Sequence, residues 1–218
     1  MPVENWSTQM NVLASRRSVM TLYSDDTSPA GHAVRIVLAE KDINVEINFV
    51  NEETKPEDLN DLNPYDDLLT LIDRELVLYE PQIMMEYLDE RYPHPPLMPV
   101  DPVSRANNRQ LRYRIMRDLY ALVADLSGTN EIAAANARKV MRDNLTVIAP
   151  AFALKPFFLS DEYSLVDCCL IPLLWRLDHF AVKMPAQAKP LVQYAQRMFG
   201  RDAFRASLSP RERELRAR

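Results

Sequence analysis

Glycine is scarce in this sequence, with three residues among 218. Loops that wrap around phosphate groups need several glycines, because their backbone N–H groups must approach the ligand closely. Neither a G-x-G-x-x-G nor a G-x-x-x-x-G-K-[ST] pattern occurs. A nucleotide-binding loop of either kind is therefore excluded.

Cysteine and histidine are also few. Cys168 and Cys169 are adjacent, so they cannot join distant segments, and their apolar surroundings predict that both are buried. The three histidines show neither a four-residue spacing nor a metal-ligand pattern. We therefore expect no disulfide framework, no metal site and no cofactor, with His32 and His179 in packing or surface roles.

Long apolar runs are missing as well. No stretch approaches the roughly 20 apolar residues that cross a bilayer. The first residues, Met1–Trp6, lack the basic-then-apolar order of a secretory signal. Together with the unpaired cysteines, which suit a reducing compartment, these features predict a cytoplasmic protein.

Charge is unevenly distributed along the chain. The formal net charge is −5, which argues against broad coating of nucleic acid. Residues 40–91 hold sixteen acidic side chains against four basic ones, whereas residues 197–218 hold seven arginines against three acids. The acidic region is either an ordinary solvated surface or a face that attracts a basic protein partner.

The first half of the chain alternates between strand and helix patterns. Apolar runs or strict alternation predict strands over 19–23, 45–49, 68–72 and 76–79. Helical spacing predicts a helix over 31–41 and another that begins near Pro81 and carries Ile83, Met84, Tyr87 and Leu88. Together these elements indicate an α/β layer of about 80 residues.

The second half is predicted to be all-α. Pro93–Pro99 is too rich in proline for a helix or a central strand and is expected to form a stiff linker. Helices are predicted from Asp101-Pro102 to about 126, over 130–149, after a capping box at Ser164–Asp167, over 190–199 before Gly200, and after a second box at Ser209–Glu212. The expected division is a leader (1–16), an α/β domain (17–93), a linker (94–101), a helical domain (102–208) and a basic tail (209–218).

Several motifs occur in the order found in one fold family. They are Ser28-Pro29 followed by Val34-Arg35 and Leu38, Asn63-Pro64 before the third strand, Glu80 after the fourth, and Ser164–Asp167 before a buried helix. On these residues the chain resembles the cytosolic glutathione transferases. The resemblance implies a thioredoxin-like β-α-β-α-β-β-α domain followed by a C-terminal helical bundle.

Longer stretches narrow the resemblance to the stringent starvation branch of that superfamily. They are 17–22, 34–41, 85–91, 93–99 and 158–167. This resemblance implies a bacterial homodimer that has the transferase fold without its activity. Its implied partners are the RNA polymerase holoenzyme and the housekeeping sigma factor, and its implied role is stress and stationary-phase transcription, without direct DNA binding.

The resemblance also locates the positions of the transferase chemistry. By position, Ser28, and less favourably Ser24 or Tyr23, would stabilise a glutathione thiolate by donating a hydrogen bond. Leu69 stands where the family has a cis-proline, and Pro81 follows Glu80 where the family has a serine. Leu69 is expected to follow a trans peptide bond, and Pro81 has neither a hydroxyl nor an N–H. A transferase that uses Ser28 remains the alternative to a non-catalytic protein.

The linker contains the candidate docking residues. Pro93, His94 and Pro95 form a stiff segment with a low ordering cost on binding, beside Tyr92, Tyr87 and Leu97 as apolar walls. From the residues alone it is either a domain spacer or a binding surface. The resemblance implies the second, a surface pocket needed for transcriptional activity, and the nearby Glu86, Asp89 and Glu90 would suit a basic partner.

Two groups of arginines have open roles. Arg105, Arg109 and Arg112 share one helical face, which is either solvated or, as the resemblance implies, near the dimer seam, where an alarmone pocket is a weaker third possibility. The tail arginines, Arg211, Arg213, Arg216 and Arg218, alternate with Glu212 and Glu214. This alternation predicts an exposed, self-paired helix.

Overall fold

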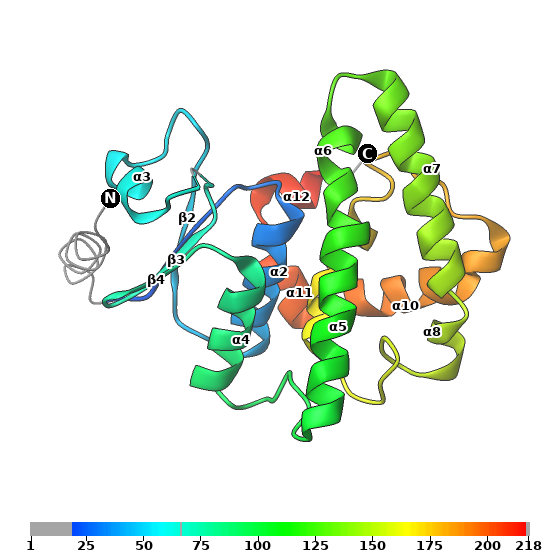
Figure 1. Ribbon diagram of the computed structural model, residues 1–218, viewed down its shortest axis with the longest axis horizontal. Coiled ribbons are helices and arrows are strands. Elements are labelled where there is room, and N and C mark those ends of the chain that lie inside the picture. Colours follow the sequence, from blue (N-terminus) through cyan, green and yellow to red (C-terminus); the bar gives the residue numbers. More distant parts are fainter. Residues whose placement is uncertain (1–18, 66, 217–218) are drawn as a thin grey trace.

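Four short strands form the sheet of the N-terminal half, in the order β2-β1-β3-β4 (Figure 1). The computed structural model describes residues 19–65 and 67–216, so the predicted leader 1–16 lies outside the described residues. β1 (Thr21–Ser24) runs parallel to β2 (Glu46–Phe49) and antiparallel to β3 (Thr70–Asp73), which turns into β4 (Leu76–Leu78). Each strand overlaps the apolar segment that predicted it, with ends that differ by at most two residues.

Helices cover both faces of this sheet. Successive side chains of a strand point to opposite faces, so Leu22 joins the core with α2 (Pro29–Glu40) and α4 (Pro81–Arg91), whereas Tyr23 packs toward α3 (Glu57–Leu62). Figure 1 shows α2 and α4 between the sheet and the helical half, with α3 on the other side. This order confirms the predicted thioredoxin-like unit.

The C-terminal half is built from helices, which confirms the predicted α/β plus all-α fold. They are α5 (Pro102–Asp118), α6 (Val123–Ser127), α7 (Glu131–Ile148), α8 (Ala151–Leu154), α9 (Leu165–Trp175), α10 (Lys189–Phe199), α11 (Asp202–Ser207) and α12 (Pro210–Glu214), with 3-10 turns η1 (Tyr120–Leu122) and η2 (Ala186–Ala188).

One boundary in the helical prediction is wrong. The helix expected to reach residue 126 ends at Asp118 and bends through η1, where the Tyr120 hydroxyl donates to the Cys169 carbonyl at 2.8 Å. Gly200 follows α10 as predicted and has right-handed dihedrals (φ −76°, ψ −14°), and the chain continues almost at once into α11.

The centre of the helical half is α9. Its capping box forms as predicted: the Ser164 hydroxyl accepts from the Val166 N–H, and the Asp167 carboxylate accepts from the Ser164 N–H at 3.0 Å. Every residue from 165 to 174 is buried. Cys168 and Cys169 are both fully buried free thiols, which confirms their predicted packing role.

The two halves share one hydrophobic core. α2 packs on both α9 and α11, and α5 packs on α9. A single apolar cluster therefore contains residues of both halves, from Leu22 in the sheet to Phe204 in α11. No helix within residues 19–65 and 67–216 combines the length and the apolar content needed to span a membrane. The position of every site described below depends on this shared core.

Candidate functional site

The segment between α4 and α5 presents Pro93, His94 and Pro95 to solvent. All three residues are exposed, and the His94–Pro95 peptide bond is cis. Tyr92 before them is half-buried, whereas Leu97 after them is 3% exposed and belongs to the core. Leu97 therefore supports the segment from inside, and its prediction as a wall of the exposed surface is wrong.

A buried lysine holds this segment in place. Lys41, at the end of α2, has a fully buried side chain whose Nζ donates to the carbonyl oxygens of Tyr92 (2.6 Å) and Pro95 (2.7 Å). The same Nζ lies 2.8 Å from Asp89 Oδ1, which also accepts from the Leu97 N–H at 2.8 Å. The segment is therefore tied to both α2 and α4. The sequence analysis missed this role, because a lysine after an apolar helix normally points into solvent.

Further support comes from the helical half. The Leu97 carbonyl accepts from the Leu165 N–H at 2.9 Å, at the first residue of α9. The segment thus has fixed contacts below it on three helices while its outer face stays open. The segment is therefore tied to the rest of the molecule on its inner side and exposed on its outer side.

The acids near this surface are paired inside the molecule. Asp89 is 7% exposed and bound to Lys41, Glu90 pairs with Arg105 at 3.3 Å, and Glu86 pairs with Arg109 at 2.8 Å. Each of these three acids therefore has a cationic partner within the chain. These ion pairs reduce the negative charge that a basic partner would meet at this surface.

The three arginines of α5 connect α5 to α4. Arg112 is 1% exposed, binds Glu86, and its Nε donates to the Asn108 side chain at 3.0 Å, so a fully solvated face is excluded for it. Burial acts to raise the pKa of Glu86, but the hydrogen bonds from Arg109 and Arg112 outweigh burial and place that pKa below its usual value. Among the described residues, Arg112 Nη1 has no hydrogen-bond partner.

The positions of the transferase chemistry are only partly brought together. A cavity of about 440 Å³ is lined by Ser28 and Leu69 together with Asp25, Glu52, Tyr65, Asp67 and Leu68. Ser28 Oγ accepts from the Gly31 N–H at 3.4 Å and caps α2. Among the described peptide bonds, His94–Pro95 is the cis one, so the bond before Leu69 is trans as predicted.

The other positions of the transferase chemistry either cap a helix or already form hydrogen bonds within the chain. The Glu80 carboxylate accepts from the Gln82 N–H at 3.2 Å and caps α4, with Pro81 in the first turn. Neither residue is among those that line the cavity. Ser24 Oγ accepts from Arg35 Nη1 at 2.6 Å and donates to the Asp25 carbonyl at 2.8 Å, and Tyr23 is buried.

This fold is matched by two family models. The glutathione S-transferase N-terminal domain matches residues 18–90, and the glutathione S-transferase C-terminal domain matches residues 103–202. A crystal structure of a glutathione transferase from Methylococcus capsulatus superposes with a TM-score of 0.79 at 23% identity, over 87% of this chain and 97% of that chain. The protein therefore has the glutathione transferase fold.

Closer sequence relatives define a branch of this superfamily. The chain is 46% identical to a stringent starvation protein A homolog of Coxiella burnetii, over 92% of this chain and 97% of that protein. It is 48% identical to the homolog of Pasteurella multocida, over 91% and 94% of the two chains. The chain belongs to the stringent starvation protein A family.

Proposed function

We propose that this protein is a non-catalytic, cytoplasmic regulator that docks on RNA polymerase and its housekeeping sigma factor during stress and stationary phase. Membership of the stringent starvation protein A family supports the class of function. The observation that carries the docking site is the Lys41 contact, which fixes an exposed Pro93-His94-Pro95 surface from below.

A surface of this kind suits protein recognition. Binding costs less ordering entropy when the contacting segment already has its bound shape, and here prolines, two carbonyl contacts and the Asp89 bond supply that order. The proline rings offer apolar contact area, and the His94 imidazole offers one donor and one acceptor. Docking through a small rigid cluster is typical of interfaces in which a few residues carry most of the affinity.

Replacement of all three residues by alanine tests the docking site. We expect the triple variant to lose about 30-fold or more of its affinity for polymerase in pull-downs against core enzyme and sigma factor separately. Its melting temperature should stay nearly unchanged, because these side chains are exposed. A matched control replaces the exposed Pro150 and His179 of the helical half by alanine. Normal polymerase binding by the triple variant would show that the docking surface lies elsewhere.

Glutathione-dependent transfer is the second candidate, because Ser28 and Leu69 do line one cavity. The side chains that line this cavity do not fit glutathione. Glutathione carries two carboxylates, and Asp25, Glu52 and Asp67, which also line the cavity, would repel them. Pro81 has no N–H to offer a carboxylate. Calorimetric titration with glutathione should give no saturable heat. Micromolar binding that is lost in Ser28→Ala would favour the transferase.

A homodimer is part of the proposal. Ile83 is 56% and Leu76 is 38% exposed beside a hollow of about 400 Å³ between β4 and α4. Exposed apolar side chains on adjacent elements suit a second copy of the chain. Light scattering should find Ile83→Glu monomeric, and Ile132→Glu, at an 85% exposed site on α7, dimeric. An Ile83→Glu dimer would place the seam on another face.

A further inference from the structure

The end of the chain folds back across both halves of the molecule. We call residues 207–216 the C-terminal strap; it contains α12, whose capping box forms as the sequence predicted. Ser209 Oγ accepts from the Glu212 N–H at 3.0 Å, and Glu212 Oε2 accepts from the Ser209 N–H at 2.8 Å. The predicted exposure of this helix holds for Pro210, Arg211, Arg213 and Glu214, but Glu212 is fully buried. The predicted self-pairing is wrong, because Glu212 binds Arg35 and Arg176 and Arg211 binds Asp26.

The strap makes polar contacts with each domain. Toward the N-terminal half, Ser209 Oγ donates to the Asp26 carbonyl at 2.5 Å, and Arg211 pairs with the Asp26 carboxylate at 3.2 Å. Toward the helical half, Trp175 Nε1 donates to the Glu212 carbonyl at 2.9 Å, and Arg216 lies 5.0 Å from the Trp175 ring centre. The strap therefore holds the two domains at their junction.

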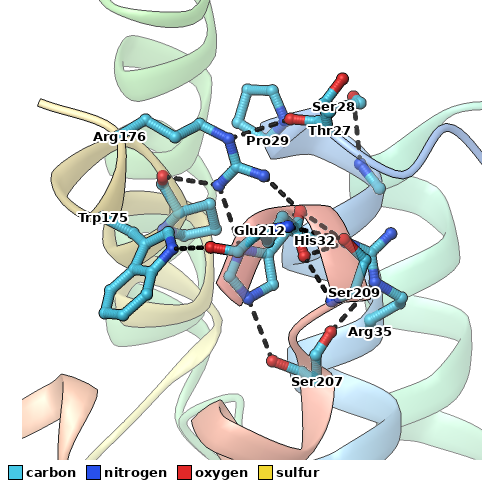
Figure 2. A network of polar contacts seen from close by, with 12 residues as sticks. Thr27, Ser28, Pro29, His32, Arg35, Trp175, Arg176, Ser207, Ser209 and Glu212 are labelled. Carbon is cyan, nitrogen blue, oxygen red and sulfur yellow. Dashed lines mark hydrogen bonds and ion pairs between the residues drawn. The ribbon is translucent and has the colours of Figure 1, made fainter. Parts of the chain in front are cut away.

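Beneath the strap lies a buried cluster of charges (Figure 2). Arg35 Nη2, on α2, donates to both Glu212 carboxylate oxygens at 2.7 Å, and Arg176 Nη2, just after α9, also binds Glu212. His32 Nδ1 lies 3.7 Å from Glu212 Oε1. All four side chains are at most 1% exposed. With His32 neutral, two positive charges share one negative charge.

The hydrogen bonds determine how His32 carries its proton. Ser207 Oγ donates to the Phe204 carbonyl at 2.7 Å, so it accepts from His32 Nε2, which lies 3.0 Å away. His32 Nδ1 accepts from Arg176 Nη1 at 3.1 Å. A second proton on this ring would have to sit on Nδ1, directly against a guanidinium group. Burial first, and then Arg176 and Arg35, hold the pKa of His32 well below its usual value.

We propose that the C-terminal strap is an acid-released clamp between the two domains, with His32 as the group whose protonation releases it. The charged groups that face His32 are Arg35 from its own helix, Arg176 from the end of α9 and Glu212 from α12, while α11 presents the uncharged Ser207 and Phe204. Protonated His32 would make three cations share one carboxylate. Release of the strap opens this buried site to solvent, which hydrates the charged ring.

The direction of the pH effect follows from linkage. In the released state solvent reaches His32, so its pKa rises toward the ordinary value of about 6.5, whereas in the clamped state burial and the two arginines keep it neutral to lower pH. The clamp is therefore at full strength above pH 6.5, and the released fraction rises up to tenfold for each pH unit below it. Release also uncovers Trp175 and its aromatic neighbours Phe199 and Phe204, which pack edge-to-face against it.

Hydrogen exchange of the strap amides between pH 8 and pH 5, corrected for intrinsic rates, tests this proposal. We expect strap protection to lie below that of α9 and to fall about tenfold per unit below pH 6.5. His32→Asn, which keeps an acceptor for Arg176, should lose this pH dependence, and His179→Asn, an exposed control, should keep it. The same slope in His32→Asn and the unaltered protein, or equal protection of the strap and α9, would overturn the proposal.

A second pair of variants tests the counter-charge independently. Glu212→Gln keeps the side-chain shape but leaves Arg35 and Arg176 without their shared carboxylate, so strap protection should already be lost at pH 8. Trypsin should then cut after Arg211 and Arg213 at least tenfold faster, with helical content retained. Glu214→Gln makes the same change at an exposed site of the same helix and should behave like the unaltered protein. Unchanged protection in Glu212→Gln would refute the clamp.

Discussion

At the scale of single residues, the main feature is a set of arginine side chains that are buried in the core. Arg35, Arg112 and Arg176 are among its largest fully buried side chains, and each contacts a carboxylate on another element. A buried ion pair adds little net stability, but removing one partner leaves an uncompensated charge in a low-dielectric environment. These residues therefore determine how the elements fit together more than how stable the fold is.

Lys41→Met is the most informative single change at the docking surface. It keeps the side-chain length but removes the partner of Asp89 and the donor to Tyr92 and Pro95. We expect a loss of about 3–5 kcal/mol in the free energy of unfolding, measured by urea denaturation. Lys139→Met, at an exposed site on α7, should change it by less than about 0.5 kcal/mol. Equal effects of the two changes would contradict the buried contact.

The paired cysteines should be chemically inert in the folded protein. Both side chains are fully inaccessible, and burial raises the pKa of Cys169 to about 12 and that of Cys168 well above its usual value. The thiolate is the reactive form, so a thiol-specific reagent should label neither residue at pH 8 and both residues in denaturant. Rapid labelling of the native protein would show that α9 opens.

At the scale of elements, local chemistry predicted the caps of three helices, at Asp101, Ser164 and Ser209. It missed the Ser28 cap, and α2 begins at Pro29 rather than at the predicted residue 31. Side chains at Ser28, Asp101, Asn130, Ser164 and Ser209 accept hydrogen bonds from the first turns of their helices. A cap acts over three residues, so its signal is contained in the sequence. Helix ends were harder to predict: the break after Asp118 serves the contact of Tyr120 with α9, which local sequence does not encode.

Gly31 shows how a tertiary contact overrides local propensity. Alanine usually favours a helix over glycine by about 1 kcal/mol. Here a Cβ at Gly31 would lie 2.2 Å from Ser24 Oγ, which Arg35 and the Asp25 carbonyl hold in place. We therefore expect Gly31→Ala to destabilise the protein by about 1–3 kcal/mol in thermal or urea unfolding.

A control for Gly31→Ala exists in the same chain. Gly128 is exposed and has a negative φ of −76°, and a Cβ there would lie 3.1 Å from the Ala124 carbonyl oxygen, so Gly128→Ala should destabilise the protein less than Gly31→Ala. If Gly31→Ala proved stabilising, the Ser24–Arg35 contact would not be rigid, and the packing between β1 and α2 would be looser than the distances indicate.

At the scale of the whole molecule, the two domains behave as one packing unit. The apolar cluster includes residues of the sheet, α2, α9 and α11. Polar contacts add further connections: Lys41 joins α2 to α4, Arg112 joins α5 to α4, and the C-terminal strap joins α2 to α9. Neither half can separate without exposing this core and leaving buried charges unpaired.

We therefore expect unfolding in a single cooperative transition. Scanning calorimetry at neutral pH should give a ratio of calorimetric to van't Hoff enthalpy near one for each chain. Tryptophan fluorescence and circular dichroism should report the same midpoint. Two resolved transitions would show that the α/β and helical halves are independent, which their shared core argues against.

The amino-acid sequence by itself determined the four strands, most of the helices, the caps at Asp101, Ser164 and Ser209 and the burial of the cysteine pair, because apolar periodicity and capping act over a few residues. It also determined the family, through motifs such as Ser164–Asp167 and the 93–99 segment. Only the tertiary structure decided where the charges went. Lys41 turned inward to Asp89, Arg112 to Glu86, and Glu212 to Arg35 and Arg176. Such pairs join residues up to 177 positions apart, so their electrostatic energy depends on distances that exist only once the chain has folded.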